Sequence, residues 1–199
     1  MTERLKKQLE FSLEVDKTKD IFRQTYISSG ERKENDAEHA WHMALMAYLL
    51  REHANKEVDI LKVIIMILIH DLVEIDAGDT YAFDAEANLD KREREVKAAD
   101  RIFNILPEEQ AREIYGLWEE FETYETPEAK FAHTLDNFQP LMLNNSTGGV
   151  SWREHGVKLS QILKRNSKTN EGSEKIWEYA YEVIKDNIDK GNIIDDVNV

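Results

Sequence analysis

The feature that most constrains the fold is a nearly uninterrupted apolar segment from Val58 to Ile75. Its centre, Val63–Ile69, is strictly apolar and rich in β-branched residues, which by themselves are also typical of a buried strand. Two observations favour a helix instead. The apolar pattern begins at Ile60 and continues to Val73, and the rest of the chain supplies no evident sheet partner. We therefore expect an almost uniformly apolar helix, and such a helix lies at the centre of a protein.

The remaining composition also favours helices. The 199 residues include only 8 Gly and 3 Pro, which is few for a protein built from many turns. Hydrophobic residues make up 41% and charged residues 33%, as in globular proteins rather than disordered ones. The length suits one ordinary domain, and no repeat or linker-like stretch divides it. We expect a single all-α domain over residues 1–199.

The net charge limits which partners the chain can bind, and the absence of cysteine limits which residues can hold a metal. With 40 acidic and 26 basic residues, the net charge of -14 repels nucleic acid and anionic lipid, so we expect neither as a partner. A small phosphorylated substrate stays compatible, because a metal ion and a few basic groups can outweigh the global field locally. Since the chain has 0 Cys, any metal must be held by histidine and carboxylate.

The sequence also predicts a cytoplasmic location. Residues 1–7 are charged and lack the apolar core of a signal peptide. The longest strictly apolar stretch, Val63–Ile69, is far shorter than the roughly 20 residues that a membrane span needs.

Capping residues and periodicity predict the other helices. Asn35 is a good N-cap, and Glu38 three residues later completes a capping box. Pro140 is expected to bend or end the helix that contains it, and residues 144–149 are expected to form a loop. The expected helices are Glu3–Thr25, one from Asn35, Lys91–Leu106, one with Pro107 in its first turn, one from Thr126 toward Leu143, Trp152–Asn166 and Glu174–Lys190.

Polar residues that could bind a metal or transfer protons lie at the end of the apolar segment and directly after it. His70 and Asp71 stand at its end, where an ionised carboxylate beside a histidine is costly unless it is paired or bound to metal. Glu74 lies four residues after His70 and therefore on the same helical face. Gly78-Asp79 follows in the next loop.

Two further polar residues occupy apolar contexts. His39 falls in the first turns of its helix, on the side that carries Met43. Asp136 lies on an otherwise apolar helix face, next to Leu135 and near Phe138. Taken singly, each of these residues is compatible with a buried polar group that is satisfied by hydrogen bonds.

In order, His39, His70-Asp71 and Asp136 resemble the H…HD…D signature of the HD superfamily of metal-dependent phosphohydrolases. The filled positions Asn35–His39, Glu74 and Gly78-Asp79 are similar to the branch of 5′-deoxynucleotidases and HD-domain-containing protein 2. The resemblance covers roughly residues 22–143, whereas the C-terminal helices over residues 152–190 are much less diagnostic.

The ordered set of motifs, rather than any single His-Asp pair, carries this resemblance. It implies an all-α HD-type helical bundle and a homodimer. It implies one divalent ion, manganese, cobalt, iron or zinc, with the ligands His39, His70, Asp71 and Asp136. Glu74 matches the general acid/base position, and Asp79 matches a second carboxylate that orients substrate or water. The implied reaction is hydrolysis of a deoxynucleoside 5′-monophosphate to a nucleoside and phosphate.

One departure concerns the substrate. Nucleotidases of this family carry an Arg-Trp pair that contacts phosphate and sugar, but here Phe22-Arg23-Gln24 has no tryptophan after the arginine. Arg23 and Arg32 are the candidates for phosphate contact, each with an ordinary salt bridge as the alternative. The missing tryptophan leaves selectivity for deoxyribose open.

Several alternatives remain at the level of sequence. Glu74 could be a solvated carboxylate at a helix end, and Gly78-Asp79 could be an ordinary turn. His42 and His133 each lie three residues from a candidate ligand and could support the site. The chain could act on another small nucleotide or phosphate ester, or bind metal and nucleotide as a regulator without turnover.

Overall fold

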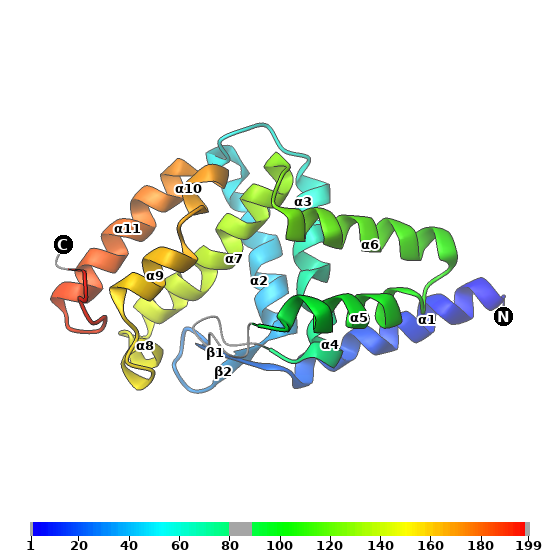
Figure 1. Cartoon of the computed structure of the whole chain (residues 1–199), viewed down its shortest axis with the longest axis horizontal. Coiled ribbons are helices and arrows are strands. Elements are labelled where there is room, and N and C mark those ends of the chain that lie inside the picture. Colours follow the sequence, from blue (N-terminus) through cyan, green and yellow to red (C-terminus); the bar gives the residue numbers. More distant parts are fainter. Residues whose placement is uncertain (1, 80–88, 198–199) are drawn as a thin grey trace.

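A computed structural model describes residues 2–79 and 89–197 of the chain. It confirms the all-α class, with one small two-stranded sheet added (Figure 1). In chain order the elements are α1 (Glu3–Val15), the 3-10 helix η1 (Asp16–Asp20), β1 (Phe22–Tyr26), β2 (Lys33–Asn35), α2 (Asp36–Leu50), η2 (Arg51–His53), α3 (Ile60–Ile69), η3 (His70–Val73), α4 (Glu74–Ala77), α5 (Lys91–Phe103), α6 (Glu108–Thr123), α7 (Pro127–Ser146), α8 (Val150–Glu154), α9 (Leu159–Arg165), α10 (Thr169–Gly172) and α11 (Glu174–Asp189).

The apolar segment forms α3, as expected. Asp59 caps its start, because the Asp59 carboxylate accepts hydrogen bonds from two backbone amides of the first turn. Val63, Met66 and Ile67 are fully buried between α2, α6 and α7. The helix is not buried on every side, however, since Leu61 is 64% exposed. The segment then tightens into η3, which carries the His-Asp pair.

The helices α2, α3 and α7 occupy the middle of the molecule, with α1, α5 and α6 toward the N-terminal side and α8 to α11 toward the C-terminal side (Figure 1). The larger hydrophobic core joins α2, α3, α7 and α11. A second core surrounds the fully buried Trp118 and joins η3, α5 and α6. The end of α3 therefore lies where both cores meet.

The expected capping box of α2 is confirmed: Asn35 accepts from the Glu38 amide at 2.9 Å, and the Glu38 carboxylate accepts from the Asn35 amide at 3.2 Å. The expected start of α7 at Thr126 is also confirmed. The alternative that this helix ends at Pro140 is wrong, because α7 continues to Ser146 and includes part of the expected loop. Burial of the apolar side chains on both sides of Pro140 offsets the lost backbone hydrogen bond.

The expectation of one helix over Glu3–Thr25 is wrong, because its second half contains a strand. The helix ends at Val15, and β1 pairs antiparallel with β2, with Phe22 opposite Asn35. The aromatic and β-branched residues of β1 favour this extended form. Gly30, with a φ of 74°, reverses the chain between the two strands. The hairpin places β1 beside the start of α2.

The helices of the C-terminal part begin and end at partly different residues from those expected. The helix expected over Trp152–Asn166 is divided into α8 and α9, with Gly156 between them at a φ of 55°. The helix expected to start at Glu174 is confirmed as α11. In the middle of the chain, α5 ends at Phe103, three residues earlier than expected.

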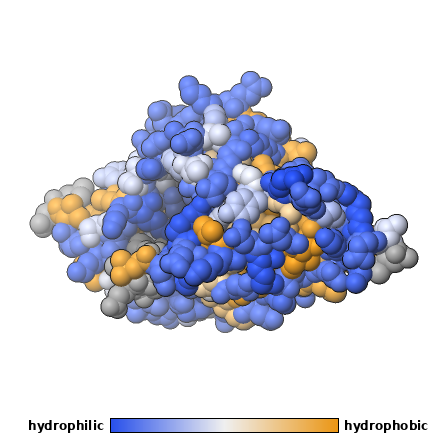
Figure 2. Space-filling model, turned by 45° about the vertical axis from the view of Figure 1, so that its right-hand side comes forward, coloured by the Kyte–Doolittle hydropathy of each residue, from blue (hydrophilic) through white to orange (hydrophobic). Residues whose placement is uncertain are grey.

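The surface is mostly hydrophilic on the face that Figure 2 shows, with hydrophobic residues in small separate groups. Within the described ranges, no helix has the length and apolar character needed to cross a bilayer.

Candidate metal and substrate site

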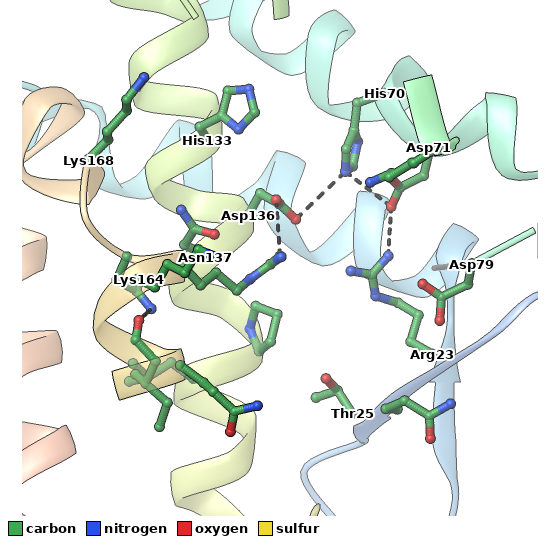
Figure 3. A pocket seen from close by; sticks show the side chains of 18 of the residues that line it. Arg23, Thr25, His70, Asp71, Asp79, His133, Asp136, Asn137, Lys164 and Lys168 are labelled. Atoms are coloured by element: carbon green, nitrogen blue, oxygen red, sulfur yellow. Dashed lines mark hydrogen bonds and ion pairs between the residues drawn. The ribbon is translucent and has the colours of Figure 1, made fainter. Parts of the chain in front are cut away.

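A cavity of about 940 Å³ opens beside the junction of α3 with α7. Its wall comes from β1, η3, α4, the start of α5, the end of α6, α7, α8 and the segment from α9 to residue 168. Figure 3 shows part of this wall. The sequence-predicted residues that line it are Arg23, His70, Asp71, Glu74, Asp79 and Asp136. His39 lies directly behind this wall, fully buried in the first turn of α2.

Both histidines are held through the same ring atom. His39 Nδ1 lies 3.0 Å from Oε1 of the buried Gln139, and His70 Nδ1 lies 2.7 Å from the carbonyl oxygen of Ile67. Each acceptor calls for a proton on Nδ1, so the neutral form of each ring can present the Nε2 lone pair to a metal ion. Metal-binding histidines are oriented in the same way, by a hydrogen bond from the other ring nitrogen.

The two Nε2 atoms converge on carboxylates. His39 Nε2 lies 3.2 Å from Oδ1 of Asp136, and His70 Nε2 lies 3.8 Å from the same oxygen. His70 Nε2 is also 3.1 Å from Oδ2 of Asp71. We call His39, His70 and Asp136 the His/Asp group, because each offers one ligand atom and all three atoms lie within 4.8 Å of one another. This group is placed to bind a metal.

The electrostatics of the group follow from burial and pairing. Burial alone lowers the pKa of His70, yet the neighbouring Asp71 and Asp136 raise it well above its ordinary value. Burial alone raises the pKa of Asp136, but the hydrogen bond with His39 and the nearby His70 hold this pKa well below its ordinary range. The carboxylates thus remain charged and attract positive charge to the centre.

The donor set suits a divalent ion. Two imidazole nitrogens with carboxylate oxygens are ligands for manganese, cobalt, iron or zinc. The Nε2 atom of His70 is buried and makes no hydrogen bond within the described residues. A buried polar atom of this kind calls for a partner, and a cation at the centre would supply one.

Arg23 reaches the site from β1. Its Nη1 atom lies 2.7 Å from Oδ2 of Asp71 and 3.3 Å from Oδ1 of Asp36. Burial works against the charged guanidinium, but the carboxylates, Asp71 foremost, raise the pKa of Arg23 above its ordinary value. A buried and permanently charged arginine therefore stands next to the His-Asp pair.

Glu74 and Asp79 also face this cavity (Figure 3 shows Asp79 beside Arg23). Glu74 is 5% exposed, and burial followed by the charges of Asp71 and Asp36 raises its pKa well above the ordinary value. Burial, and then Asp71, also raises the pKa of Asp79. A raised pKa favours the protonated form of a carboxyl group, and a protonated carboxyl group can serve as a general acid.

The structure does not bring Arg32 to this cavity. Its guanidinium forms an exposed, two-fold ion pair with Glu38, at 2.6 and 2.8 Å. Of the two supporting candidates, His133 lines the cavity and stacks on Phe121 with ring centroids 3.9 Å apart. His42 contacts Gln139 at 3.2 Å and so lies one residue removed from His39.

Sequence reasoning missed several contributors. Asp36 is buried and forms a second close acidic group with Asp71 and Glu74. Its position three residues before His39, on the same helical face, was a signal that could have found it. Gln139, three residues after Asp136, carried the same kind of signal, whereas Arg165 carried none, because its contact with Asp136 depends on how α9 packs against α7.

A scan against family models finds the HD domain over residues 15–177, most of the chain. The chain belongs to the HD-domain family. Its order of His39, His70-Asp71 and Asp136 therefore stands within a family match that extends well beyond these motifs.

Curated relatives of this HD domain carry one recurrent name. The protein named 5′-deoxynucleotidase HDDC2 from Homo sapiens is 34% identical over 113 residues, which are 56% of this chain and 53% of the relative. Its counterpart from Dictyostelium discoideum is 33% identical over 140 residues, or 67% of this chain and 74% of the relative. The chain thus matches about half the length of the human relative.

Solved structures match over more of the chain. A protein from Magnetospirillum magnetotacticum MS-1, described as a predicted metal-dependent phosphohydrolase, superposes with a TM-score of 0.91 at 46% identity and covers 96% of each chain. A protein of unassigned function from Pyrococcus furiosus shares the fold, with a TM-score of 0.64 at 23% identity. The HD fold is thereby shown for this chain.

Proposed function

We propose that this HD domain is a metal-dependent phosphomonoesterase that converts deoxynucleoside 5′-monophosphates to deoxynucleosides and phosphate. One observation carries the proposal: two histidines tethered through Nδ1 direct Nε2 toward Asp136, in a cavity that also holds Glu74 with a raised pKa. The names of the relatives, 5′-deoxynucleotidase and metal-dependent phosphohydrolase, support the same reaction class.

His39, His70, Asp71 and Asp136 would hold one divalent ion, with manganese, cobalt, iron and zinc as the candidates. Asp71 joins the His/Asp group because its Oδ2 atom lies 3.1 Å from His70 Nε2. A divalent ion held there supplies Lewis-acid polarisation of the phosphoryl group.

The protein residues account for the proton transfers. A water oxygen attacks phosphorus and the P–O5′ bond breaks. Glu74 delivers its proton to the departing O5′ atom, and Asp79 orients the water and accepts its proton. Arg23 places a positive charge beside the phosphoryl oxygens, where negative charge develops in the transition state. The deoxynucleoside and inorganic phosphate then leave.

A regulator without turnover is the weaker candidate. A regulator needs no carboxyl group with a raised pKa in its binding cavity, yet the pKa values of both Glu74 and Asp79 are raised. Burying Glu74 beside Asp71 and Asp36 is costly, and catalysis offers a reason for that cost.

The oligomeric state and location belong to the proposal as well. We propose a homodimer in which a second copy covers the exposed apolar residues of α2 and α3, among which Trp41 is 66% exposed and Leu61 is 64% exposed. Light scattering after size exclusion tests this, and a Trp41→Glu protein should be a monomer. A monomeric wild type at micromolar concentration would contradict it. Cell fractionation tests the expected cytoplasmic location.

The first experiment is phosphate release after loading the purified protein with manganese or cobalt. The panel holds deoxy- and ribonucleoside 5′-monophosphates, 3′-monophosphates, triphosphates and cyclic nucleotides. Selective release from the 5′-deoxymonophosphates is expected. Phosphate release from another class of nucleotide would show that the substrate differs from the proposed one. No release from any compound, with metal bound, would refute the proposed activity. The control is Asp136→Ala, which should lose the metal.

A further inference from the structure

The cavity has a second positively charged side, formed by the last turn of α9 and the turn that follows. Lys164, Arg165 and Lys168 all line the cavity there, and we call these three residues the basic wall. Figure 3 shows Lys164 and Lys168 on the α7 side of Asp136, whereas Arg23 lies on the other side, on β1. Three neighbouring cations on one wall stand out in a chain of net charge -14.

Arg165 is the member next to the His/Asp group. Its Nη2 atom lies 3.5 Å from Oδ2 of Asp136, while the other oxygen of Asp136 faces His39. Its side chain is 31% exposed, so the guanidinium is partly shielded from water yet open to the cavity. The long contact with Asp136 leaves most of its five N–H donors available to an incoming anion.

The basic wall also carries the less neutralised cations of the cavity. Arg23 is already engaged by Asp71 and Asp36, and Lys91 lies 3.3 Å from Glu95. Within residues 2–79 and 89–197, no carboxylate forms an ion pair with Lys164 or Lys168. An anion that enters the cavity therefore meets uncompensated positive charge on the basic wall.

The backbone of the basic wall is held in place. The Tyr124 hydroxyl donates to the carbonyl of Lys168 at 2.7 Å, and the Lys168 ammonium lies 4.9 Å from the Tyr124 ring centroid. Thr134, on α7, donates to the carbonyl of Thr169 at 2.8 Å. This hydrogen bond fixes the segment after the basic wall to α7, the helix that carries Asp136 of the His/Asp group.

We propose that the basic wall is an anion subsite that binds the phosphate group of the nucleotide, with Arg165 as its contact beside the reacting centre. Arg165 offers a planar fork that matches phosphate oxygens, and Lys164 and Lys168 draw the dianion into the cavity of an otherwise acidic protein. This inference rests on the proposed function and assigns substrate binding to the C-terminal helices.

The test compares Arg165→Gln and the double variant Lys164→Gln/Lys168→Gln with the wild type. Affinity for inorganic phosphate is measured by calorimetry on the manganese-loaded and the metal-free protein, alongside KM for a deoxynucleoside 5′-monophosphate. Arg165→Gln should weaken phosphate binding about ten-fold or more, because a hydrogen bond to a charged group is lost. The double variant should weaken it roughly three-fold and reduce its dependence on salt.

The control is Lys185→Gln on α11, where an exposed lysine also lies over a tyrosine ring, at 5.2 Å, but outside the cavity. It should change neither phosphate affinity nor KM. Arg165→Lys keeps the charge without the planar fork, so its phosphate affinity should lie between those of the wild type and Arg165→Gln. Thermal melts and metal content are recorded for every variant.

Unchanged phosphate affinity in Arg165→Gln overturns the subsite, as does a wild type that binds no phosphate. Loss of metal from Arg165→Gln, with phosphate affinity of the reloaded protein unchanged, also overturns it and makes Arg165 a support for Asp136. If the wild type hydrolyses no nucleotide but the variants lose phosphate affinity, the subsite stands and the proposed function fails. If nucleotide turnover is normal and phosphate affinity and KM match the wild type in all variants, the subsite alone fails.

Discussion

Replacing Gln139 with leucine should weaken metal binding without removing any proposed ligand. Gln139 is fully buried, and its Oε1 atom accepts the Nδ1 proton of His39 at 3.0 Å. Its amide group also donates to Oε2 of Glu34 at 2.9 Å. The side chain therefore fixes both the tautomer and the ring orientation of His39, and it satisfies a buried carboxylate at the same time.

The magnitude follows from what the substitution leaves behind. Loss of an outer partner of a ligating histidine costs about 10–100-fold in metal affinity. Oε1 of Glu34 lies 3.5 Å from the same Nδ1 atom of His39 and can replace part of the lost interaction. We therefore expect the lower part of that range, about 10–30-fold, or roughly 1.4–2 kcal/mol. Glu34 also loses a donor while buried, which should cost about 1–3 kcal/mol of stability.

The assay is competition for manganese or zinc against a chromophoric chelator at fixed pH, with the fold checked by circular dichroism. Gln110→Leu is the matched control, because it removes one amide hydrogen bond, to Gln8 at 2.8 Å, far from the cavity. An unchanged metal affinity in a folded Gln139→Leu protein would refute the reasoning, since the orientation of His39 would then not depend on Gln139.

Four other substitutions, of which Gly116→Ala serves as a comparison for Gly172→Ala, test the packing, the electrostatics and the chemistry. At Gly172 an added methyl group would lie 2.2 Å from a backbone carbonyl oxygen of α7. Gly172→Ala should therefore lower stability in thermal denaturation by about 1–3 kcal/mol or more. At Gly116, in α6, the methyl group meets open space, so Gly116→Ala should raise stability by about 0.5–1 kcal/mol. Burial and a neighbouring glutamate raise the pKa of Glu122 to about 7. Because the pKa of Glu122 is higher in the folded state than in the unfolded state, its contribution to folding stability is present below about pH 4.5 and is lost as the pH rises through 7. In urea titrations, Glu122→Gln should therefore be more stable than the wild type at pH 8, by about 1–3 kcal/mol. At about pH 4.5 the variant should not be more stable than the wild type. Glu74→Gln should keep its metal and lower kcat roughly 10²-fold, and an unchanged kcat would remove Glu74 from the mechanism.

The sequence predicted those parts of the molecule that depend on local signals. The capping box at Asn35 and the start of α7 at Thr126 follow from neighbouring residues, and the structure has both. The candidate ligands followed from ordered family motifs rather than from periodicity. The motif could name His39 and Asp136, but their approach to 3.2 Å depends on the packing of α2 against α7.

The errors occurred where a long-range contact decided the local structure. The region around Arg23 was expected to be helical, yet pairing with β2 makes it a strand. Only this strand aims Arg23 at Asp71, whereas Arg32 in the following turn pairs with Glu38 at the surface. Two arginines of equal standing in the sequence therefore have different environments, and strand pairing decides which one enters the site.

The C-terminal helices illustrate the same dependence at the largest sequence separation. Arg165 contacts Asp136 only because the segment after α9 packs closely on α7. Gly172 permits that approach, since a side chain there would collide with the Lys130 carbonyl and the Thr134 hydroxyl of α7. A larger residue at this position requires α10 or α7 to shift, and we expect this shift to displace the basic wall, because Lys168 directly precedes α10. Gly172→Ala should therefore weaken phosphate binding as well as stability, although residue 172 does not line the cavity.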